Sequence, residues 1–259
     1  MSWAKNLRVI RAMSRRALNE ILRVPGGAIP GVLAPTIFMI GLSGVFGEAA
    51  QLPAFEGDVG TDFRTFIVPV GLLQGAGFTG AATGVNLARD IEQGWFDRLL
   101  VAPTPRVVLL GGVVLSAALR VLLPVTFLLA TGFAFGLNFP GVDGMGLILV
   151  LVPAYAVVAA CWGASIALRF RTQAAGPLIQ SVMFMFILFT ASYAPLDLLA
   201  PWLEAVARVN PVNQVIEGLR AGFVADPTWH ETWPALLTVA GMAVFFGALA
   251  LRGVQRTGR

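Results

Sequence analysis

The sequence predicts an all-α integral membrane protein with six transmembrane helices. Hydrophobic residues make up 57% of its 259 residues and charged residues only 12%, against about 25% charged in typical soluble proteins. The apolar residues gather in long runs with almost no charge, and such runs cross a hydrocarbon core of about 30 Å as helices. We therefore expect a single membrane domain over residues 1–259 rather than a soluble enzyme with a membrane anchor.

The first 25 residues predict a basic amphipathic helix. Apolar side chains recur at spacings of three and four residues, from Trp3 through Leu7 to Ile21, and Lys5 and five arginines fall mostly between them. A helix of this kind lies in the plane of an anionic membrane surface. We expect such an interface helix over residues 1–25; an ordinary cytosolic tail is the alternative.

Six apolar runs follow, and each is expected to form one span. The third is too long for a single crossing, so its first two turns are expected to project from the membrane, which places Arg120 near the inner interface. The second run carries Gly71, Gly75, Gly80 and Gly84, spaced for close packing against other helices. The predicted spans are residues 28–46, 66–86, 107–137, 145–168, 174–194 and 234–252.

A charged segment separates the second and third spans, and we expect a short helix over residues 88–102. Its acids and arginines would each cost several kcal/mol in hydrocarbon, so the segment lies in water. Asp90 is the expected N-cap, with Gln93 three residues on as in a capping box. Pro103 and Pro105 end the helix. Its apolar stripe comprises Ile91, Trp95, Phe96, Leu99 and Leu100, and a tethered helix with such a stripe is suited to press against another protein.

Residues 195–231, between the fifth and sixth spans, break the pattern of long apolar runs. Prolines interrupt the stretch, and Asn210-Pro211 predicts a helix start, with asparagine as the N-cap and proline at the first helical position. Two amphipathic helices, each too short to cross the membrane, are expected here. We expect this outer helical pair to dip into the outer leaflet or lie on it; an exposed loop is the alternative.

The distribution of charge predicts which side of the membrane each segment faces. Fourteen bases and four acids lie in the N-terminal helix, residues 86–106, the turn at Arg169 and Arg171, and the C-terminal tail. The opposite side carries three bases and ten acids. Since short loops rich in lysine and arginine remain in the cytoplasm, both termini and the 88–102 helix are predicted to be cytoplasmic.

The sequence offers neither an enzyme active site nor a nucleotide-binding motif. Lys5 is its only lysine and no GxxxxGK[ST] pattern occurs, so the chain cannot hold a nucleotide in a P-loop. His230 is the only histidine, and the single cysteine, Cys161, excludes a disulfide within the chain and a CxxC motif. The spans also lack acids placed for ion coupling. We expect no catalytic residue, no metal site and no cofactor bound by this chain.

Polar and aromatic residues in two of the spans are candidates for a substrate pathway. Aromatic rings with a few hydrogen-bonding groups suit an amphipathic substrate, although helix packing and lipid contact are the alternative roles of such residues. The candidates are Gln74, Thr79 and Thr83 in the second span and Gln180, Phe184 and Phe186 in the fifth.

Two segments resemble the signatures of one transporter family. Residues 89–106, RDIEQGWFDRLLVAPTPR, resemble the ExGxx(D/E)RLLxxPxxR signature of ABC-2 type permeases, and residues 193–223 are similar to their second signature, which centres on Asn-Pro and a downstream Leu-Arg. The likeness is strongest to drug-efflux permeases of the daunorubicin-resistance type and covers the full length. The family implies a coupling helix that docks on an ATP-binding cassette subunit through Glu92, Gly94, Asp97, Arg98 and Leu99, and an outer helical pair that contains Asn210, Pro211 and Arg220. At Trp95-Phe96 the sequence departs from the smaller or polar residues common in the family, which points to a particular ATPase partner. We expect Trp95 to join the coupling residues as an aromatic anchor.

The resemblance implies the permease subunit of an ATP-binding cassette exporter in a bacterial inner membrane. Two permeases, identical or paralogous, would work with two ATPase subunits that bind ATP and Mg²⁺. They would move an amphipathic or hydrophobic substrate outward, such as a drug, a lipid or a glycoconjugate. No nucleic-acid partner is expected. The alternative function is an ATP-independent secondary carrier or a membrane-embedded lipid-modifying enzyme.

The predicted topology can be tested by labelling single cysteines in a Cys161→Ala background. Because of the charge asymmetry, Gln93→Cys is expected to react with a membrane-impermeant maleimide only from the cytoplasm, and Thr228→Cys only from outside. Labelling is measured in right-side-out and inverted vesicles. Reaction of both positions from the same side would contradict the six-span topology.

Overall fold

The computed structural model describes residues 3–23, 29–45, 63–101, 104–224 and 227–256, and within these ranges the chain is helical and contains no strand. Residues 28 and 46, which bound the predicted first span, and the helix-ending Pro103 lie outside the described residues. The helices are α1 Trp3–Arg23, α2 Ile29–Val45, α4 Phe63–Glu92, α5 Trp95–Leu100, α6 Arg106–Arg120, α7 Leu122–Ala134, α8 Gly141–Phe170, α9 Gly176–Leu188, α10 Pro201–Val209, α11 Pro211–Val224 and α12 Trp229–Arg256, with short 3₁₀ turns η3 Gln173–Ala175 and η4 Leu196–Leu198.

Four helical segments of the described chain are long and apolar enough to cross a membrane: α4, α6 with α7, α8 and α12. The helix α2 and the η3–α9 stretch are apolar but shorter. The 13 residues of α9 extend only about 20 Å at about 1.5 Å per residue. The all-helical prediction is therefore confirmed for the described residues, whereas the count of six spans stays a prediction.

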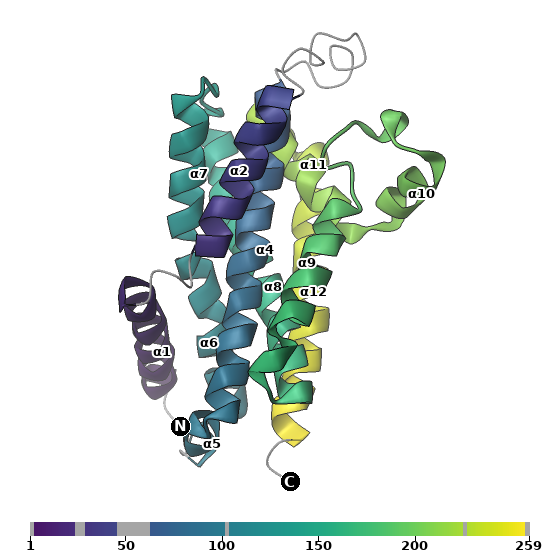
Figure 1. The fold of residues 1–259 in the computed structure, drawn as a ribbon. Coiled ribbons are helices and arrows are strands. Elements are labelled where there is room, and N and C mark those ends of the chain that lie inside the picture. The colour runs from purple at the N-terminus through teal and green to yellow at the C-terminus, as the bar shows by residue number, and fades with distance from the viewer. Residues whose placement is uncertain (1–2, 24–28, 46–62, 102–103, 225–226, 257–259) are drawn as a thin grey trace.

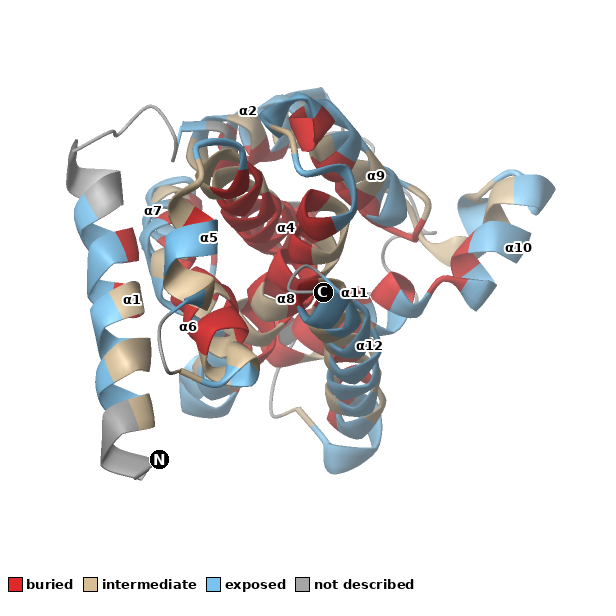
Figure 2. Cartoon of the chain, turned by 90° about the horizontal axis from the view of Figure 1, so that it is seen from below, coloured by how far each residue is buried: buried red, intermediate tan, exposed pale blue. Residues whose placement is uncertain are grey.

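The helix α4 forms the centre of the bundle (Figures 1 and 2). Of the residues in its apolar stretch, 83% are buried inside the protein, against 17% for α12. It contacts α8, α2, α9, α7 and α11, so most of the other long helices pack directly on it. By contrast, α12 leaves a long apolar face uncovered. The helix α4 is thus the interior element, and α12 is the span most exposed to the surroundings.

Glycines allow α4 and α8 to pack with their backbones in contact. A Cβ atom at Gly84 would lie 2.4 Å from Cα of Gly163, and one at Gly80 would lie 2.4 Å from the carbonyl oxygen of Ala156. Neither position can hold a side chain unless the two helices move apart. The close packing predicted from the small residues of the second span is therefore confirmed, with α8 as the helix that Gly80 and Gly84 face.

Several predicted helix boundaries differ from the structure. The third run is broken at Val121 between α6 and α7, because Pro124 has no N–H to donate to the carbonyl of Arg120. The fifth run ends at Leu188 rather than at residue 194. The sixth begins at Trp229 rather than at Pro234, because the Glu231 carboxylate reaches back and accepts hydrogen bonds from both the backbone N–H and the hydroxyl of Thr228, which is one half of a capping box.

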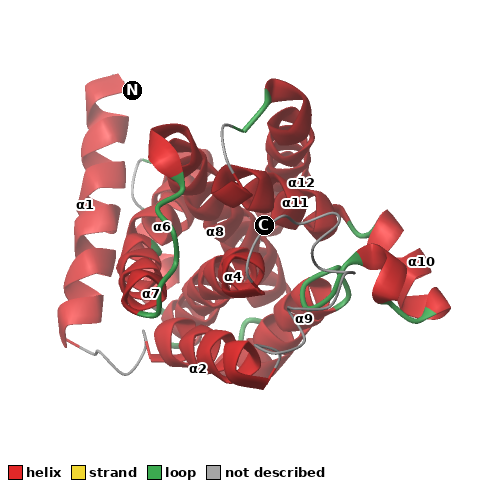
Figure 3. Ribbon diagram, turned by 90° about the horizontal axis from the view of Figure 1, so that it is seen from above, coloured by secondary structure: helices red, strands yellow, loops and turns green. Residues whose placement is uncertain are grey.

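The N-terminal helix α1 lies across the side of the bundle. Figures 2 and 3 view the bundle along its axis and show α1 at full length, where α4 and α8 are seen end-on. Its inward face packs on α6, where the Cα of Gly112 approaches closely enough that a Cβ there would lie 3.0 Å from Cβ of Met13. This crosswise position is the one expected for an amphipathic interface helix.

A single methyl group at Gly84 tests the α4–α8 contact. We expect Gly84→Ala to destabilise the protein by about 1–3 kcal/mol, the usual cost of overpacking, because the added Cβ meets backbone atoms of Gly163. Gly111→Ala is the matched control, since nothing lies within 4 Å of a Cβ there. Unfolding midpoints in detergent measure both variants, and equal midpoints would contradict the close packing.

Candidate functional site

The charged segment after α4 forms a sharp corner rather than one continuous short helix. The helix α4 continues through Glu92, and Gly94 then adopts a left-handed conformation with φ of 71°, after which α5 begins at Trp95. The prediction that Asp90 is an N-cap is therefore wrong, and so is the single helix over residues 88–102. Glycine tolerates this φ without strain, which explains why the chain turns here.

The side chain of Asp90 instead pairs with α1. Arg16 donates two hydrogen bonds to the Asp90 carboxylate, at 3.1 and 3.0 Å. The same guanidinium lies 3.6 Å from the centre of the Trp95 ring, a cation–π contact. One arginine of the interface helix thus holds both the end of α4 and the beginning of α5.

The other two acids of the segment bind the turn between α8 and α9. Glu92 accepts hydrogen bonds from the backbone N–H of Gln173 at 2.9 Å and from the hydroxyl of Thr172 at 3.3 Å. Asp97 forms an ion pair with Arg171 at 3.5 Å. Arg171 ends α8 with φ of 57°, a left-handed conformation that turns the chain toward these acids. The corner is therefore fixed to the beginning of α9 as well as to α1.

These contacts divide the predicted apolar stripe between the interior and the surface. Phe96 and Ile91 are buried, and Trp95 and Leu99 are half-buried. Arg98 is exposed, and Val101 is exposed to 86%. The exposed residues between Trp95 and Val101 are therefore Asp97, Arg98 and Val101, and Trp95 remains half-buried.

A further link joins the same end of the bundle to the C-terminal helix. Arg106, the first residue of α6, donates hydrogen bonds to the carbonyl oxygens of Val254 at 3.2 Å and Gln255 at 2.8 Å. The ends of α4, α8 and α12 and the beginnings of α6 and α9 are thus connected through polar contacts at one end of the molecule. We call α5, Arg16, Asp90, Glu92 and the 171–173 turn the corner cluster.

The opposite end of the bundle has its own polar junction, formed by the beginning of α11. Asn210 caps α11, since its side-chain oxygen accepts from the N–H of Val212 at 3.0 Å, as predicted. Its amide also donates to the carbonyl oxygens of Phe186 and Phe189, at 2.7 and 2.8 Å. Asn213 accepts from the N–H of Ala191 at 2.9 Å. These bonds end α9 early, because they hold its last carbonyl groups and the loop that follows.

Arg220 is the buried charge of this junction, with 7% of its surface exposed. Its guanidinium donates to the carbonyl oxygens of Ala191 at 2.5 Å and Ser192 at 3.1 Å. It also pairs with Glu217 at 3.2 Å and lies 3.6 Å from the centre of the Phe66 ring of α4. Burial lowers the pKa of Arg220 to about 10 and the Glu217 carboxylate opposes the shift, so the side chain remains charged at neutral pH.

The two helices expected to dip into the outer leaflet or lie on it differ in how far they are buried. The helix α11 lies inside the bundle, where Val215, Ile216 and Leu219 are fully buried. The helix α10 stands away from the bundle (Figure 1) and exposes Trp202 and Val209. Of the two helices, only α10 presents an apolar face to the surroundings.

The structure does not bring the predicted pathway residues together in one space. Gln74 is buried and donates to the hydroxyl of Tyr193 at 2.6 Å. The hydroxyl of Thr83 bonds the carbonyl of Thr79 within α4. Phe184 stacks on Phe78, with ring centres 6.0 Å apart, and Gln180 is half-buried on α9. Phe186 faces a separate pocket with Trp162. Their assignment to a pathway stays a prediction.

Sequence reasoning missed several residues that hold these two sites. Arg16, the 171–173 turn, Asn213 and Phe66 all act through contacts with residues far away in the chain, so no local pattern marks them. Asn213 had a weak signal, since it lies three residues after the Asn210 cap. Within the described residues no three side chains of histidine, cysteine, aspartate or glutamate lie together as a metal site would require.

The fold and the corner cluster define a multi-pass helical membrane protein with a charged segment fixed to several helix ends. A family model described as ABC-2 type transporter matches residues 8–224. The chain therefore belongs to the ABC-2 type transporter family.

Three relatives are named as permeases. The chain is 28% identical over 234 residues to a protein of Pyropia yezoensis named as a transport permease, ycf38, with 86% of this chain and 76% of the relative covered. It is 26% identical over 230 residues to a Mycobacterium tuberculosis protein named as a doxorubicin resistance ABC transporter permease, DrrC, and the match covers 88% of this chain and 81% of that relative. It is 25% identical over 188 residues to an Escherichia coli protein named as a multidrug ABC transporter permease, YbhR, with 69% and 50% covered.

The Glu92 contact with the 171–173 turn can be tested by hydrogen exchange. A hydrogen bond to a charged group contributes about 1.5 kcal/mol, so we expect Glu92→Ala to speed amide exchange at Gln173 roughly tenfold. Glu92→Gln retains an acceptor oxygen, so its exchange rate at Gln173 is expected to lie between those of the wild type and Glu92→Ala. Glu204→Ala, on the distant helix α10, is the control. Wild-type exchange at Gln173 in the Glu92→Ala variant would show that this contact does not hold the turn.

Proposed function

We propose that this chain is the permease subunit of an ATP-binding cassette exporter, with the corner cluster as the docking element for a separate ATPase. The observation that supports the proposal most directly is the attachment of α5. The short helix α5 carries exposed charged side chains. The corner from which it starts is bound to α1 through Arg16 and to the α8–α9 turn through Glu92 and Asp97. A partner that moves α5 would therefore move several helices together.

In this proposal, separate ATPase subunits supply the energy for transport. The sequence has no P-loop and only one lysine, so ATP and Mg²⁺ are bound by the ATPase subunits, and two copies would act on a pair of permeases. The pair is either a homodimer or two paralogues. The names of the relatives DrrC and YbhR refer to ABC transporter permeases, which agrees with this assembly.

The mechanism would be alternating access driven by ATP. Closure of the two ATPase subunits changes their contacts with α5, and only such a difference between the two states can shift the permease equilibrium. The contacts of Glu92 and Asp97 carry that displacement to the turn before α9. Asn210 holds the other end of that helix, and Arg220 holds the loop that follows it. Rearrangement of α4 and α9 would then open the path for substrate, with Gln74, Thr79, Thr83, Gln180, Phe184 and Phe186 as the proposed pathway residues.

The substrate class and the orientation are also part of the proposal. Relatives named for doxorubicin resistance and multidrug transport favour an amphipathic or hydrophobic substrate that leaves the cell. The excess of bases near the corner cluster favours a cytoplasmic position for that end of the bundle and for both termini, in a bacterial inner membrane.

Truncation of the aromatic side chain on α5 tests the docking assignment. An aromatic anchor at a protein interface contributes about 2 kcal/mol or more, so we expect Trp95→Ala to weaken ATPase binding roughly thirtyfold while membrane insertion stays intact. The measurements are recovery of the ATPase that co-purifies with the wild-type permease, and substrate-stimulated ATP hydrolysis in lipid nanodiscs.

Trp202→Ala on α10 is the control for the same measurements, since Trp202 is an exposed tryptophan far from the corner cluster. It is expected to bind the ATPase as the wild type does. Trp95 could instead anchor the corner in the headgroup layer, as interfacial tryptophans do. Wild-type affinity in Trp95→Ala would support that role and contradict the docking assignment, and export that continues without ATP would exclude an ATP-driven exporter.

A further inference from the structure

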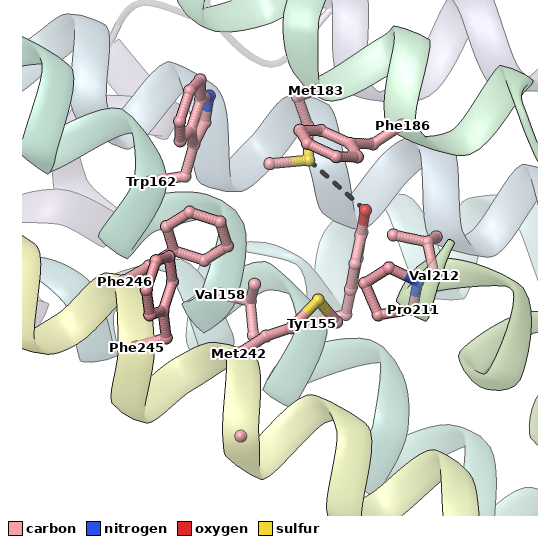
Figure 4. Close-up of a pocket in the computed structure, with 11 residues that line it drawn as sticks. Tyr155, Val158, Trp162, Met183, Phe186, Pro211, Val212, Met242, Phe245 and Phe246 are labelled. Carbon is pink, nitrogen blue, oxygen red and sulfur yellow. Dashed lines mark hydrogen bonds between the residues drawn. The ribbon is translucent and has the colours of Figure 1, made fainter. Parts of the chain in front are cut away.

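An apolar pocket of about 270 Å³ lies between α8, α9, α11 and α12 (Figure 4). Its floor is formed by side chains that are almost fully buried, among them Tyr155, Val158 and Met183. Its rim includes Gly241 and the exposed rings of Phe186 and Phe245. The pocket therefore reaches from the surface of the bundle to the buried side chains of α8.

The lining of this pocket suits a hydrocarbon and nothing charged. None of the eleven residues that line it carries a charge. Its two polar side-chain groups already have partners, since the hydroxyl of Tyr155 donates to Sδ of Met183 at 3.3 Å and the indole N–H of Trp162 donates to the carbonyl of Ile179 at 3.4 Å. A ligand inside gains only apolar contact, chiefly with aromatic rings and methionine.

The surroundings of the pocket indicate where such a ligand comes from. The pocket opens beside α12, the least covered of the four long helices. On that helix Leu237, Val244 and Phe245 are exposed to 60% or more, and in a membrane protein such a face contacts lipid. Lipid chains are therefore the neighbours of the rim.

We propose that this pocket binds one acyl chain of a membrane phospholipid, whose headgroup stays outside. The chain passes between Phe186 and Phe245 and ends against Tyr155 and Val158. Because the pocket lies between α9 and α12, the bound acyl chain contacts the side of α9 that carries Met183 and Phe186. The proposal does not depend on which substrate the protein moves or on how the ATPase docks.

A photoreactive phospholipid tests this directly. The full-length protein is reconstituted in vesicles that contain a phospholipid with a diazirine near the end of one acyl chain, and the adducts are mapped by mass spectrometry. We expect adducts on Tyr155 and Val158, which have 1% of their surface exposed and cannot be reached from the lipid unless a chain enters the pocket. If adducts form only on exposed residues such as Val244, the proposal is wrong.

Substitution at the rim provides the matched comparison. Gly241→Leu is expected to lower the adducts on Tyr155 and Val158 severalfold, because its side chain adds bulk at the rim and its Cβ meets nothing within 4 Å. Gly241→Ala, which disturbs the helix least, is expected to lower them partly. Gly41→Leu on α2, where a Cβ also meets nothing within 4 Å, should leave them unchanged. Equal labelling in the wild type and Gly241→Leu would overturn the proposal.

A second probe distinguishes the source of the chain. A free fatty acid that carries the same diazirine is added to vesicles of unlabelled phospholipid. We expect it to label Tyr155 and Val158 weakly, because the bulk phospholipid competes for the pocket. If the free fatty acid labels these residues and the photoreactive phospholipid does not, the occupant is a diffusible amphiphile and the phospholipid proposal fails.

Discussion

The backbone contact between α4 and α8 is the constraint on which the rest of the structure depends. At Gly84 and Gly163 the two helices approach until no side chain fits between them, and such close approach is a principal source of helix association in a membrane, where hydrocarbon surroundings remove the usual hydrophobic drive. This contact places α4 at the centre of the bundle and lets α2, α7, α9 and α11 pack around it. Looser packing here would separate the helices that the polar contacts at both ends connect.

The two polar sites lie at opposite ends of the same helices. The 30 residues of α4 extend about 45 Å, with Phe66 under the Arg220 guanidinium near one end and Asp90 and Glu92 at the other. The helix α9 is held in the same way, by Glu92 through the turn that precedes it and by Asn210 at its end. A displacement of α5 therefore acts on helices that are fixed at both ends, and this arrangement favours rigid movement of α4 and α9 over local bending.

Local chemistry made part of this organisation predictable and left part of it hidden. Asn210-Pro211 starts α11 as predicted, because a cap acts within three residues of itself. The bonds from Thr228 to the Glu231 carboxylate are equally local, and the sequence prediction overlooked them. Asp90 shows the limit of such reasoning: it has the chemistry of an N-cap, but Arg16 is 74 residues away in sequence, and nothing near Asp90 marks that partner.

The sequence by itself determined the class of the protein, because burial in hydrocarbon requires long apolar helices and forces the charges into the segments between them. It also determined the family, since both signature segments are contiguous in the chain. Only the tertiary structure decided that α11 is an interior helix, that the three acids of the corner bind Arg16 and the 171–173 turn, and that an apolar pocket opens beside α12. Those features depend on which helix faces come together, and side chains remote in sequence meet only once the helices have packed.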